Sequence, residues 1–498
     1  MTTTRAESSG SLVLGLDVGT QGTKGLLLDA DSRRVVARGA ARYGVIEGLP
    51  PGASEQHPDT WLAAVRDVAA QLLAAAGPGA AARVGGVGIS GQQHGLVVLD
   101  EQRRVIRPAK LWNDTSTTPQ ADELSAALGR RIPVGFTASK ILWLKRHEEE
   151  NWRRVKHVLL PHDFLNERLT GRPVMEAGDA SGTGFFDPVK RAFDEEVMAW
   201  IDPRLRELVP PLLAAGEPAG RLSPSGAALL GLREGLPVAA GGGDNMCSAI
   251  GSGATRAGVV TCSLGTSGTV FAYADRPVVD PEGLIAPFCD STGGWLPLLC
   301  VMNCTNVTEE VHAAFPDLSL DELTRAAEQE PPGAGGLLWL PFLQGERVPD
   351  LPDATSTLLG LRGGALRPGR LFRAALEGVA LNLGWGLQRL AALGLRMETV
   401  RLVGGGAHNR LWQQILADVF GVPVVRLAEA ESGALGAAIQ AGWTARRLAG
   451  EKVSCDEVAQ PFITMAGEAA QPDTARAEFY REAGVRFRAA VDGLYGEG

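Results

Sequence analysis

Two short turns built from glycine and threonine have the composition of a phosphate-binding loop. They are Gly19-Thr-Gln-Gly-Thr23 and Gly265-Thr-Ser-Gly-Thr269, and each follows an apolar segment typical of a β-strand. Glycine lets the backbone approach a ligand closely, and backbone N–H groups and hydroxyls are donors to phosphate oxygens. One such turn is also common in ordinary hairpins. Two turns in corresponding places indicate that one phosphate-binding plan is used twice.

Two aspartates stand at the ends of expected strands. Asp17 directly precedes the first turn, and Asp244 lies between a Gly-Gly-Gly run and a short helix that begins near Asn245. Asp17 suits a Mg²⁺ ligand, with a solvated or capping carboxylate as the alternative. Asp244 suits a general base, and helix N-capping is its alternative.

Further polar and aromatic residues follow other strand ends. Gln93 and His94 lie in Gly91-Gln-Gln-His-Gly95, and Trp112 precedes Asn-Asp. Amide, imidazole and indole groups suit the hydroxyls and C–H faces of a sugar, although a histidine or tryptophan also occurs for purely structural reasons. Lys24 follows the first turn within reach of a phosphate, or is an exposed strand lysine. The turn Gly404-Gly-Gly-Ala-His-Asn409 would let a ring and ribose approach the backbone, or simply joins a strand to a helix.

The elements that position these residues alternate between strand and helix. We expect a strand hairpin over 12–28, an amphipathic helix over 58–76 and a strand over 84–89, followed in the second half by another hairpin over 259–273. A long helix over 367–393, a strand over 399–403 and helices over 411–420, 432–442 and 473–494 complete the chain. The fold class is therefore α/β with two domains of one plan. The expected domains are 12–253 and 254–450, between a flexible tail at 1–11 and an extension at 451–498 that ends in a helix.

Composition excludes several classes of protein. Of the 498 residues 45% are hydrophobic and 21% charged, and the net charge is −9, which disfavours nucleic acid and anionic membranes as partners. No apolar run approaches the roughly 18 residues of a membrane helix, and no secretory leader is recognisable, so we expect a cytoplasmic protein. The chain has no Walker A loop, dinucleotide fingerprint, nucleophile elbow or HExxH motif.

In this order the residues resemble the FGGY family of carbohydrate kinases from about Leu12 to Gly442. One family signature matches Gly135-Phe-Thr-Ala-Ser-Lys140-Ile-Leu-Trp143-Leu-Lys-Arg-His147, and a second is recognisable between Ser356 and Glu377. Within the family, five segments resemble members that act on xylulose. These are Ser90-Gly-Gln-Gln-His-Gly95, Leu111-Trp-Asn-Asp114, Pro161-His-Asp-Phe164, Gly241-Gly-Gly-Asp-Asn245 and Pro341-Phe-Leu-Gln-Gly-Glu-Arg347. Gln93 departs from the methionine found in many of those members.

The resemblance implies a fold similar to actin, hexokinase and the chaperone ATPase, with an ATP and sugar cleft between two duplicated domains. It assigns Mg²⁺ to Asp17, catalysis to Asp244 as the base, and sugar contacts to Gln93, His94, Trp112, Asp244 and Asn245. It assigns ATP to Thr20, Thr23, Lys24, Gly265, Thr266, Ser267, Gly405, Gly406 and Asn409. A homodimer is a further expectation from the family.

The implied activity is ATP-dependent phosphorylation of D-xylulose to D-xylulose 5-phosphate in pentose catabolism. The alternatives are a kinase of the same family for ribulose, fuculose, glycerol or a pentitol, and a non-catalytic sugar or nucleotide sensor. A chaperone-like ATPase is disfavoured, because only about fifty residues follow Gly442 and a peptide-binding domain needs more.

Overall fold

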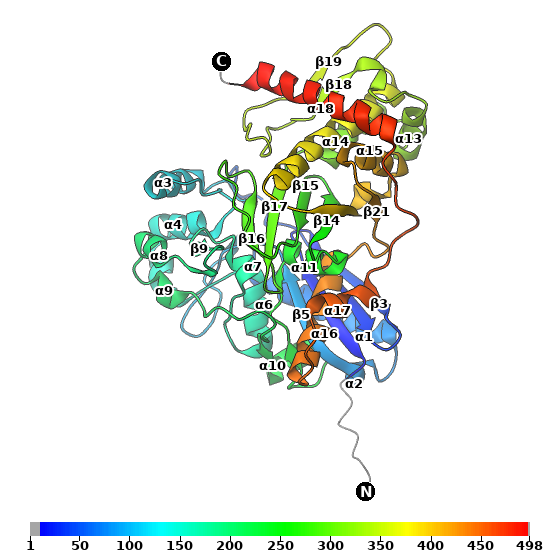
Figure 1. Ribbon diagram of the computed structural model, residues 1–498. Coiled ribbons are helices and arrows are strands. Elements are labelled where there is room, and N and C mark those ends of the chain that lie inside the picture. The colour runs from blue at the N-terminus through cyan, green and yellow to red at the C-terminus, as the bar shows by residue number, and fades with distance from the viewer. Residues whose placement is uncertain (1–9, 497–498) are drawn as a thin grey trace. The chain divides into compact units, whose positions relative to one another are not determined.

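The structure is a computed structural model that describes residues 10–496 (Figure 1). Residues 1–9 of the predicted N-terminal tail therefore lie outside the described part of the chain. Contacts divide the chain into two units. The first unit comprises the chain up to Thr255 together with Pro287–Leu296 and Glu431–Ile463. The second unit comprises Arg256–Ala286, Pro297–Ala430 and the chain from Thr464 onward.

The first unit is built on a sheet in the order β11-β12-β5-β1-β2-β3, with β13 also paired to β5. The predicted hairpin is confirmed, because β1 and β2 are antiparallel with Asp17 opposite Lys24. β1 and β5 are parallel, and Asp17 lies opposite Ser90. The strands of this sheet are β1 (Leu12–Val18), β2 (Gly22–Asp29), β3 (Arg34–Arg42), β5 (Val84–Gly91), β11 (Gly220–Arg221), β12 (Pro237–Val238) and β13 (Gly242–Gly243).

One face of this sheet packs on α1 (Pro58–Ala76), which has the predicted bounds. Side chains alternate between the faces of a strand, so Leu14 and Leu16 join Trp61 and Val65 of α1 in one core. Val13 belongs to a different core that includes Ala434 and Ala438. Asp17 shares the parity of Val13 and thus points to that second face.

The second face is covered by α16 (Ser432–Leu448), seen in Figure 1 as an orange helix against the blue strands. The sequence predicts this helix in the second half of the duplicated plan, whereas the structure packs it on the first sheet. The reason is backbone contact through small residues. A Cβ added to Gly15 would lie 2.1 Å from the carbonyl oxygen of Ala434, and a Cβ added to Gly88 would lie 2.0 Å from the carbonyl oxygen of Ala437. Local periodicity predicts such a helix but not the sheet on which it packs.

The second unit repeats the strand plan of the first. β17, β15, β14, β20 and β21 lie side by side in this order, with β14 antiparallel to β15 and parallel to β20. β1 stands in the same way between antiparallel β2 and parallel β5. The duplication predicted from the two turns is therefore confirmed at the level of topology. The strands are β14 (Gly258–Leu264), β15 (Gly268–Ala272), β17 (Trp295–Val301), β20 (Met397–Val403) and β21 (Val424–Arg426).

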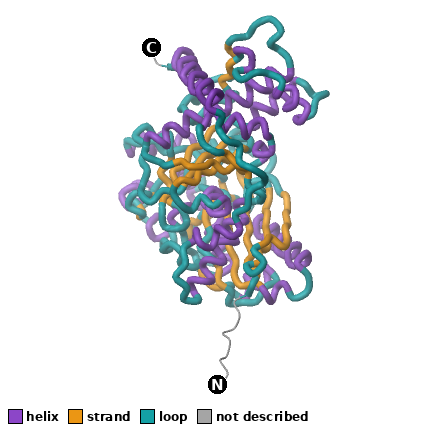
Figure 2. Tube along the Cα trace, turned by 45° about the vertical axis from the view of Figure 1, so that its right-hand side comes forward, coloured by secondary structure: helices purple, strands orange, loops and turns teal. Residues whose placement is uncertain are grey.

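Helices α14 and α18 dominate the rest of the second unit. α14 (Pro368–Ala392) is buried over much of its length, and α18 (Thr474–Tyr495) forms the long helix that leads to the C-terminus in Figure 2. Both were predicted within two residues at each end. A buried network joins them, because Glu377 of α14 accepts hydrogen bonds from Arg373 Nε and from Tyr480 Oη of α18.

The remaining elements connect these layers. In the first unit they are β4 (Glu55–Gln56), α2 (Ala80–Arg83), β6 (Val97–Leu99), β7 (Ala109–Lys110), α3 (Thr118–Leu128), α4 (Thr137–His147), α5 (Glu149–Arg154), β8 (His157–Leu159), α6 (Pro161–Thr170), α7 (Ala177–Ala180), β9 (Phe186–Asp187), β10 (Ala192–Phe193), α8 (Glu195–Ile201), α9 (Leu205–Leu208), α10 (Pro224–Leu230), α11 (Asp244–Ser252), α17 (Cys455–Ala459) and η3 (Gln460–Phe462). In the second they are α12 (Thr305–Ala314), α13 (Leu320–Glu328), η1 (Ala334–Gly336), β18 (Leu338–Leu340), β19 (Thr357–Leu359), η2 (Gly405–His408) and α15 (Arg410–Phe420), while β16 (Ala286–Cys289) begins at the boundary. Within residues 10–496, no helix combines the length and apolarity that crossing a membrane requires.

Candidate active site

In the first unit, predicted site residues gather where the parallel strands β1, β5 and β13 end. Asp17 is the penultimate residue of β1, and its Oδ1 accepts a 2.6 Å hydrogen bond from Ser90 Oγ of β5. Burial raises the pKa of the Asp17 carboxyl, and the charge of Glu431 adds to the effect, against the hydrogen bond from Ser90. A carboxylate whose charged form its surroundings disfavour is stabilised by a nearby cation.

The start of α16 lies directly against this carboxylate. A Cβ added to Gly433 would be 2.8 Å from Asp17 Oδ2, so only glycine lets the helix begin there. Helix N-termini carry partial positive charge that favours a neighbouring carboxylate. Gly433 was not predicted as a site residue, because its role depends on a contact between segments that are far apart in the sequence.

Asp244 is the first residue of α11, and Gly243 occupies the N-cap position without a side-chain cap. The N-cap alternative for Asp244 is therefore not what the structure shows. Its Oδ1 accepts hydrogen bonds from the Asn245 backbone N–H at 2.8 Å and from Asn245 Nδ2 at 3.0 Å. Burial raises the pKa of Asp244 to about 7, and the Asp17 charge contributes in the same direction.

Asn245 links Asp244 to Gln93. Its Nδ2 donates to Gln93 Oε1 at 2.9 Å as well as to Asp244 Oδ1. Gln93 Nε2 is buried and has no hydrogen-bond acceptor among the described residues. Gly243 allows the close approach, since an added Cβ would lie 2.5 Å from Gln93 Cγ. The amide N–H of Gln93 is thus a donor left for a ligand.

His94 has an unusual backbone conformation beside Gln93. Its φ of 63° lies in the left-handed region, where residues other than glycine are strained. The ring packs between Phe136 and Phe288, at centroid distances of 5.0 and 5.9 Å. Gly182 is needed opposite it, because a Cβ there would lie 1.9 Å from His94 Cε1. The surrounding structure therefore holds the imidazole in one place.

Trp112 contacts the first glycine turn directly. Its Nε1 donates to Thr20 Oγ1 at 3.0 Å, and Thr20 Oγ1 in turn donates to Gln92 Oε1 at 2.9 Å. The indole is 37% exposed, which leaves a face accessible. The structure thus connects a residue assigned to the sugar with a residue assigned to the nucleotide, a link that the sequence did not predict.

The other two residues assigned to the first turn are placed differently from each other. Thr23 is fully buried, and its Oγ1 lies 3.2 Å from Tyr43 Oη, which donates to the Gly19 carbonyl at 2.8 Å. Thr23 is therefore linked to the turn through Tyr43. Lys24 is 55% exposed and forms a 2.8 Å ion pair with Glu431.

Two further groups near this site were missed by the sequence analysis. The His162 imidazole is buried, and its Nδ1 lies 2.7 Å from Asp179 Oδ2. Burial disfavours the charged ring, but the carboxylates of Asp163 and Asp179 raise the pKa of His162 to about 9. Gln440 of α16 brackets Gly241, accepting from its N–H at 2.7 Å and donating to its carbonyl at 3.0 Å. The Pro161-His-Asp segment was a sequence signal for the first group, whereas nothing local marked Gln440.

In the second unit, the turn at 265–268 joins β14 to β15 and lies against the beginning of α12. The Gly265 carbonyl accepts from Thr305 N–H at 2.9 Å, and the Thr266 carbonyl accepts from Cys304 N–H at 3.1 Å. Thr266 is exposed and Ser267 is partly exposed. Neither hydroxyl has a hydrogen-bond partner within the described part of the chain, in contrast to the hydroxyls of Thr20 and Thr23 in the first turn.

The glycine turn after β20 packs beside that turn. A Cβ on Gly406 would lie 2.9 Å from Leu264 Cβ and 3.1 Å from Thr305 Cγ2, whereas Gly405 has open space around it. Asn409 caps α15, because its Oδ1 accepts from Trp412 N–H at 3.0 Å, and its Nδ2 donates to Thr324 Oγ1 at 2.9 Å. The structure thus brings the predicted residues of this unit to one end of its sheet and gives Asn409 a structural role.

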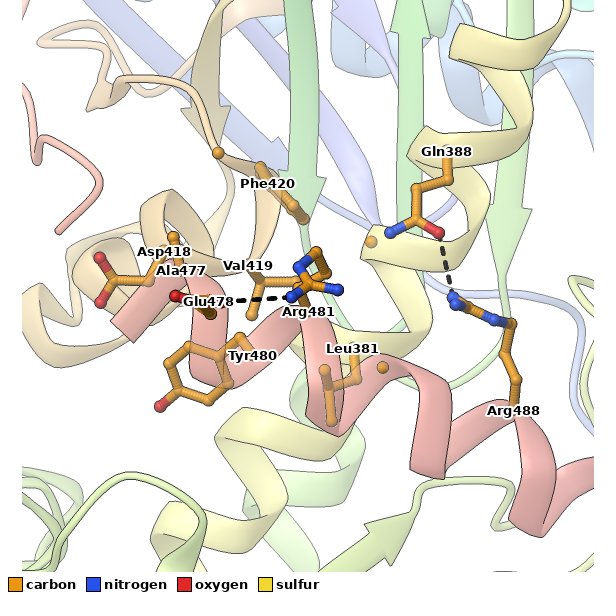
Figure 3. Close-up of a pocket in the computed structure, with 13 residues that line it drawn as sticks. Leu381, Gln388, Asp418, Val419, Phe420, Ala477, Glu478, Tyr480, Arg481 and Arg488 are labelled. Atoms are coloured by element: carbon orange, nitrogen blue, oxygen red, sulfur yellow. Dashed lines mark hydrogen bonds and ion pairs between the residues drawn. The ribbon is translucent and has the colours of Figure 1, made fainter. Parts of the chain in front are cut away.

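A separate groove of about 370 Å³ lies between α14, the end of α15 and α18 (Figure 3). It contains none of the predicted site residues. Arg481 bonds to Glu478 at 3.4 Å and Arg488 to Gln388 at 3.0 Å, which are the dashed contacts in the figure. The first contact lies within α18, and the second joins α18 to α14.

Within residues 10–496, no group of three or more His, Cys, Asp or Glu side chains is arranged to hold a metal ion. Mg²⁺ commonly uses one or two carboxylates and completes its shell with water and substrate phosphates. A pair such as Asp17 and Asp244 fits that kind of site and does not resemble a structural zinc site.

Comparisons with known proteins agree with this geometry. The N-terminal domain of the FGGY family of carbohydrate kinases matches residues 12–251, and the C-terminal domain matches residues 260–445. The chain is 39% identical to a xylulose kinase of Haemophilus influenzae over 97% of this chain and all of the relative. It is 41% identical to a xylulose kinase of Streptomyces coelicolor over 92% of each chain.

A solved structure shows the same fold. The crystal structure of xylulose kinase from Rhodospirillum rubrum has a TM-score of 0.87 and 29% identity, and the match covers 97% of this chain and 99% of that one. The two sheets share one strand plan, polar residues lie at their strand ends, and both family domains match in order along the chain. The chain belongs to the FGGY family of carbohydrate kinases.

Proposed function

We propose that the protein transfers the terminal phosphoryl group of ATP to the primary hydroxyl of D-xylulose, which gives D-xylulose 5-phosphate. The relatives named xylulose kinase support this substrate, since two of them are about 40% identical over more than 90% of this chain. The observation that carries the proposal is the Asp244–Asn245–Gln93 arrangement. It combines a carboxylate of raised pKa with an amide donor that has no acceptor among the described residues.

Asp244 acts as the base in this proposal. A pKa of about 7 lets the carboxylate accept a proton near neutral pH and release it afterwards. The proton of the sugar hydroxyl moves to a carboxylate oxygen of Asp244 as the hydroxyl oxygen attacks the terminal phosphorus of ATP. The bond from that phosphorus to the bridging β-phosphate oxygen breaks, and ADP leaves. Asn245 holds Oδ1 with two hydrogen bonds, so the carboxylate keeps one orientation during the transfer.

The sugar is held by groups whose positions are already set. Gln93 Nε2 donates to a sugar oxygen, and the imidazole of His94 is kept in place by two aromatic rings. Trp112 offers its exposed indole to the carbon face of the sugar while its Nε1 bonds to Thr20. Preset groups lower the entropic cost of binding and of reaching the reactive geometry.

Mg²⁺ would be held by Asp17, with Asp244 as its neighbour. Both are carboxylates whose pKa is raised by burial, and their like charges raise the pKa of Asp244 further, which an oxygen-seeking cation relieves. When bound, the cation would neutralise charge on the transferring phosphate. The hydrogen bond from Ser90 and the close packing of Gly433 hold the Asp17 side chain in place.

ATP would be held in the second unit by the open hydroxyls of Thr266 and Ser267 and by the backbone around Gly265. Gly405 and Gly406 would accommodate the adenosine, with Asn409 shaping the turn as the cap of α15. Phosphoryl transfer depends mainly on positioning and on charge stabilisation, which these groups supply.

The test is an ADP-release assay with ATP and magnesium. D-xylulose is offered beside D-ribulose, L-ribulose, L-fuculose, glycerol and pentitols, and each gives one kcat/KM. We expect D-xylulose to have the highest value by a wide margin. A higher value for another acceptor would support the kinase activity but contradict D-xylulose as the substrate. Gln93 would then be the first residue to examine. No turnover with any acceptor would favour a sensor.

A further inference from the structure

Arg347 ends the segment Pro341-Phe-Leu-Gln-Gly-Glu-Arg347 of the second unit. The segment follows β18 in the second unit and turns back on itself, so that the Glu346 N–H donates to the Leu351 carbonyl at 2.8 Å and the Leu351 N–H donates to the Glu346 carbonyl at 2.9 Å. This pair closes a tight loop with Arg347 inside it. The backbone of Arg347 is thereby held in one conformation.

Glu346 anchors the loop in the interior. Its side chain is 2% exposed, and its Oε1 accepts from Met302 N–H at 2.6 Å and from Arg347 N–H at 2.7 Å. Its Oε2 accepts from Asn303 Nδ2 at 3.1 Å and from Asn382 Nδ2 at 3.3 Å. Four hydrogen bonds to one buried carboxylate hold Glu346 in one position, and with it the backbone of Arg347.

The same short segment that receives this loop also holds the phosphate turn. Asn303 accepts from Leu343 N–H at 3.1 Å and donates to the Gly345 carbonyl at 2.7 Å. Its neighbour Cys304 donates its N–H to the Thr266 carbonyl. Residues 303 and 304 therefore fix the arginine loop on one side and the turn at 265–268 on the other.

The Arg347 side chain contacts β17, the strand that pairs with β15 beyond this turn. Its Nη1 lies 3.9 Å from Cys300 Sγ, and Cys300 of β17 pairs with Thr269 of β15, the residue that follows the turn. The side chain is exposed. Within residues 10–496, no carboxylate lies within the 4.0 Å of an ion pair from its guanidinium. A guanidinium without an ion pair, carried by a backbone that hydrogen bonds fix, thus lies near the end of β17 that pairs with Thr269.

We propose that Arg347 is a catalytic residue that contacts the phosphoryl group being transferred. A guanidinium presents a planar set of N–H donors that matches two phosphate oxygens, and its charge does not depend on pH in the working range. The contact stabilises the charge that spreads over the phosphoryl oxygens in the transition state. The identity of the reaction rests on the proposed function, whereas the choice of Arg347 rests on the geometry of the loop.

The test compares Arg347→Met and Arg347→Lys with the control Arg362→Met, an exposed arginine of the same unit. In Arg347→Met we expect kcat to fall on the order of 10²- to 10³-fold. Arg347→Lys should retain part of the activity, since it keeps the charge without the planar fork. The control should keep the wild-type kcat, and all three variants should keep the wild-type melting temperature.

Binding of ADP and of a non-hydrolysable ATP analogue is measured by calorimetry on the same proteins. A charge-assisted hydrogen bond to the terminal phosphate predicts about 10- to 100-fold weaker binding of the analogue in Arg347→Met, with ADP binding unchanged. A wild-type kcat in Arg347→Met would overturn the proposal. So would equal losses of ADP and analogue affinity, which would place the guanidinium on the inner phosphates. If the wild-type protein phosphorylates no acceptor, the proposed function fails, and the two affinities still decide the role of Arg347.

Discussion

Replacing Asp244 by asparagine should raise stability and abolish most activity in the same protein. Asparagine has the size of aspartate and retains an oxygen to accept the hydrogen bonds from Asn245 N–H and Nδ2. It lacks the charge that burial and Asp17 disfavour. The two effects have opposite signs because the folded state disfavours the charged carboxylate, whereas the proposed reaction uses it as the base.

The size of the effect follows from the pKa. A carboxyl pKa of about 7 against an ordinary 3.8 corresponds to about 4 kcal/mol of lost stability once the group is ionised in the folded state. The Asp244 side chain keeps partial solvent exposure, which screens part of this cost. We therefore expect Asp244→Asn to increase the free energy of unfolding at pH 8 by about 1 to 3 kcal/mol.

The sign of the pH dependence is also determined. Between pH 4 and 7 folded wild-type protein holds a proton on Asp244 that the unfolded chain has released, so wild-type stability falls as pH rises through this window. The asparagine variant lacks this dependence. The difference between the two proteins should therefore be small below pH 4, reach about two fifths of its full value at pH 5 and reach the full value above pH 7.

Urea unfolding at pH 5 and pH 8, without nucleotide and with EDTA, measures the difference. The exposed Asp122→Asn serves as the control and should leave stability unchanged at both pH values. A variant that is less stable than wild type at pH 8, or a difference that does not vary with pH, would refute the electrostatic reasoning. In parallel kcat should fall on the order of 10²- to 10⁴-fold, and a retained kcat would remove Asp244 from the role of base.

Two further substitutions test the parts that hold the site. Gly433→Ala places a Cβ 2.8 Å from the Asp17 carboxylate and should lower kcat by about tenfold or more. The control Gly442→Ala, in the same helix, meets only ordinary contacts at 3.8 Å and should keep the wild-type kcat. Steady-state kinetics on both variants measures the difference. Gln440→Leu removes the side chain that hydrogen-bonds the buried N–H and carbonyl of Gly241, so it should lower the free energy of unfolding by about 2 to 4 kcal/mol. Urea titration measures this change, and unchanged stability would contradict the role given to Gln440.

Elements with strong local signals were predicted well from the sequence. The helix over 58–76 carries four apolar residues on one face and begins at a proline, and α1 has the same bounds. The two hairpins were marked by apolar strands on either side of a glycine turn, and both form antiparallel pairs. These signals lie within a few residues of each other, so no distant contact is needed to recognise them.

Roles that depend on a partner's position were harder to predict. The hydroxyls of Thr20 and Thr23 look alike in sequence, yet one bonds to Gln92 and the other contacts Tyr43. Asn409 precedes a helix, and in the structure its side chain caps that helix and reaches Thr324. A polar side chain has several possible partners, and only the folded arrangement selects one.

By itself the sequence determined the α/β class, the duplicated plan and the placement of Asp17 and Asp244 at strand ends, because strand alternation and glycine turns are encoded locally. Only the tertiary structure decided that α16 lies on the first sheet, where Gly433 meets Asp17 and Gln440 holds Gly241. It also decided that Glu346 and Asn303 mount Arg347 beside the second glycine turn. Such contacts join residues that lie far apart in the chain, and close packing and hydrogen-bond satisfaction, rather than local propensity, select them.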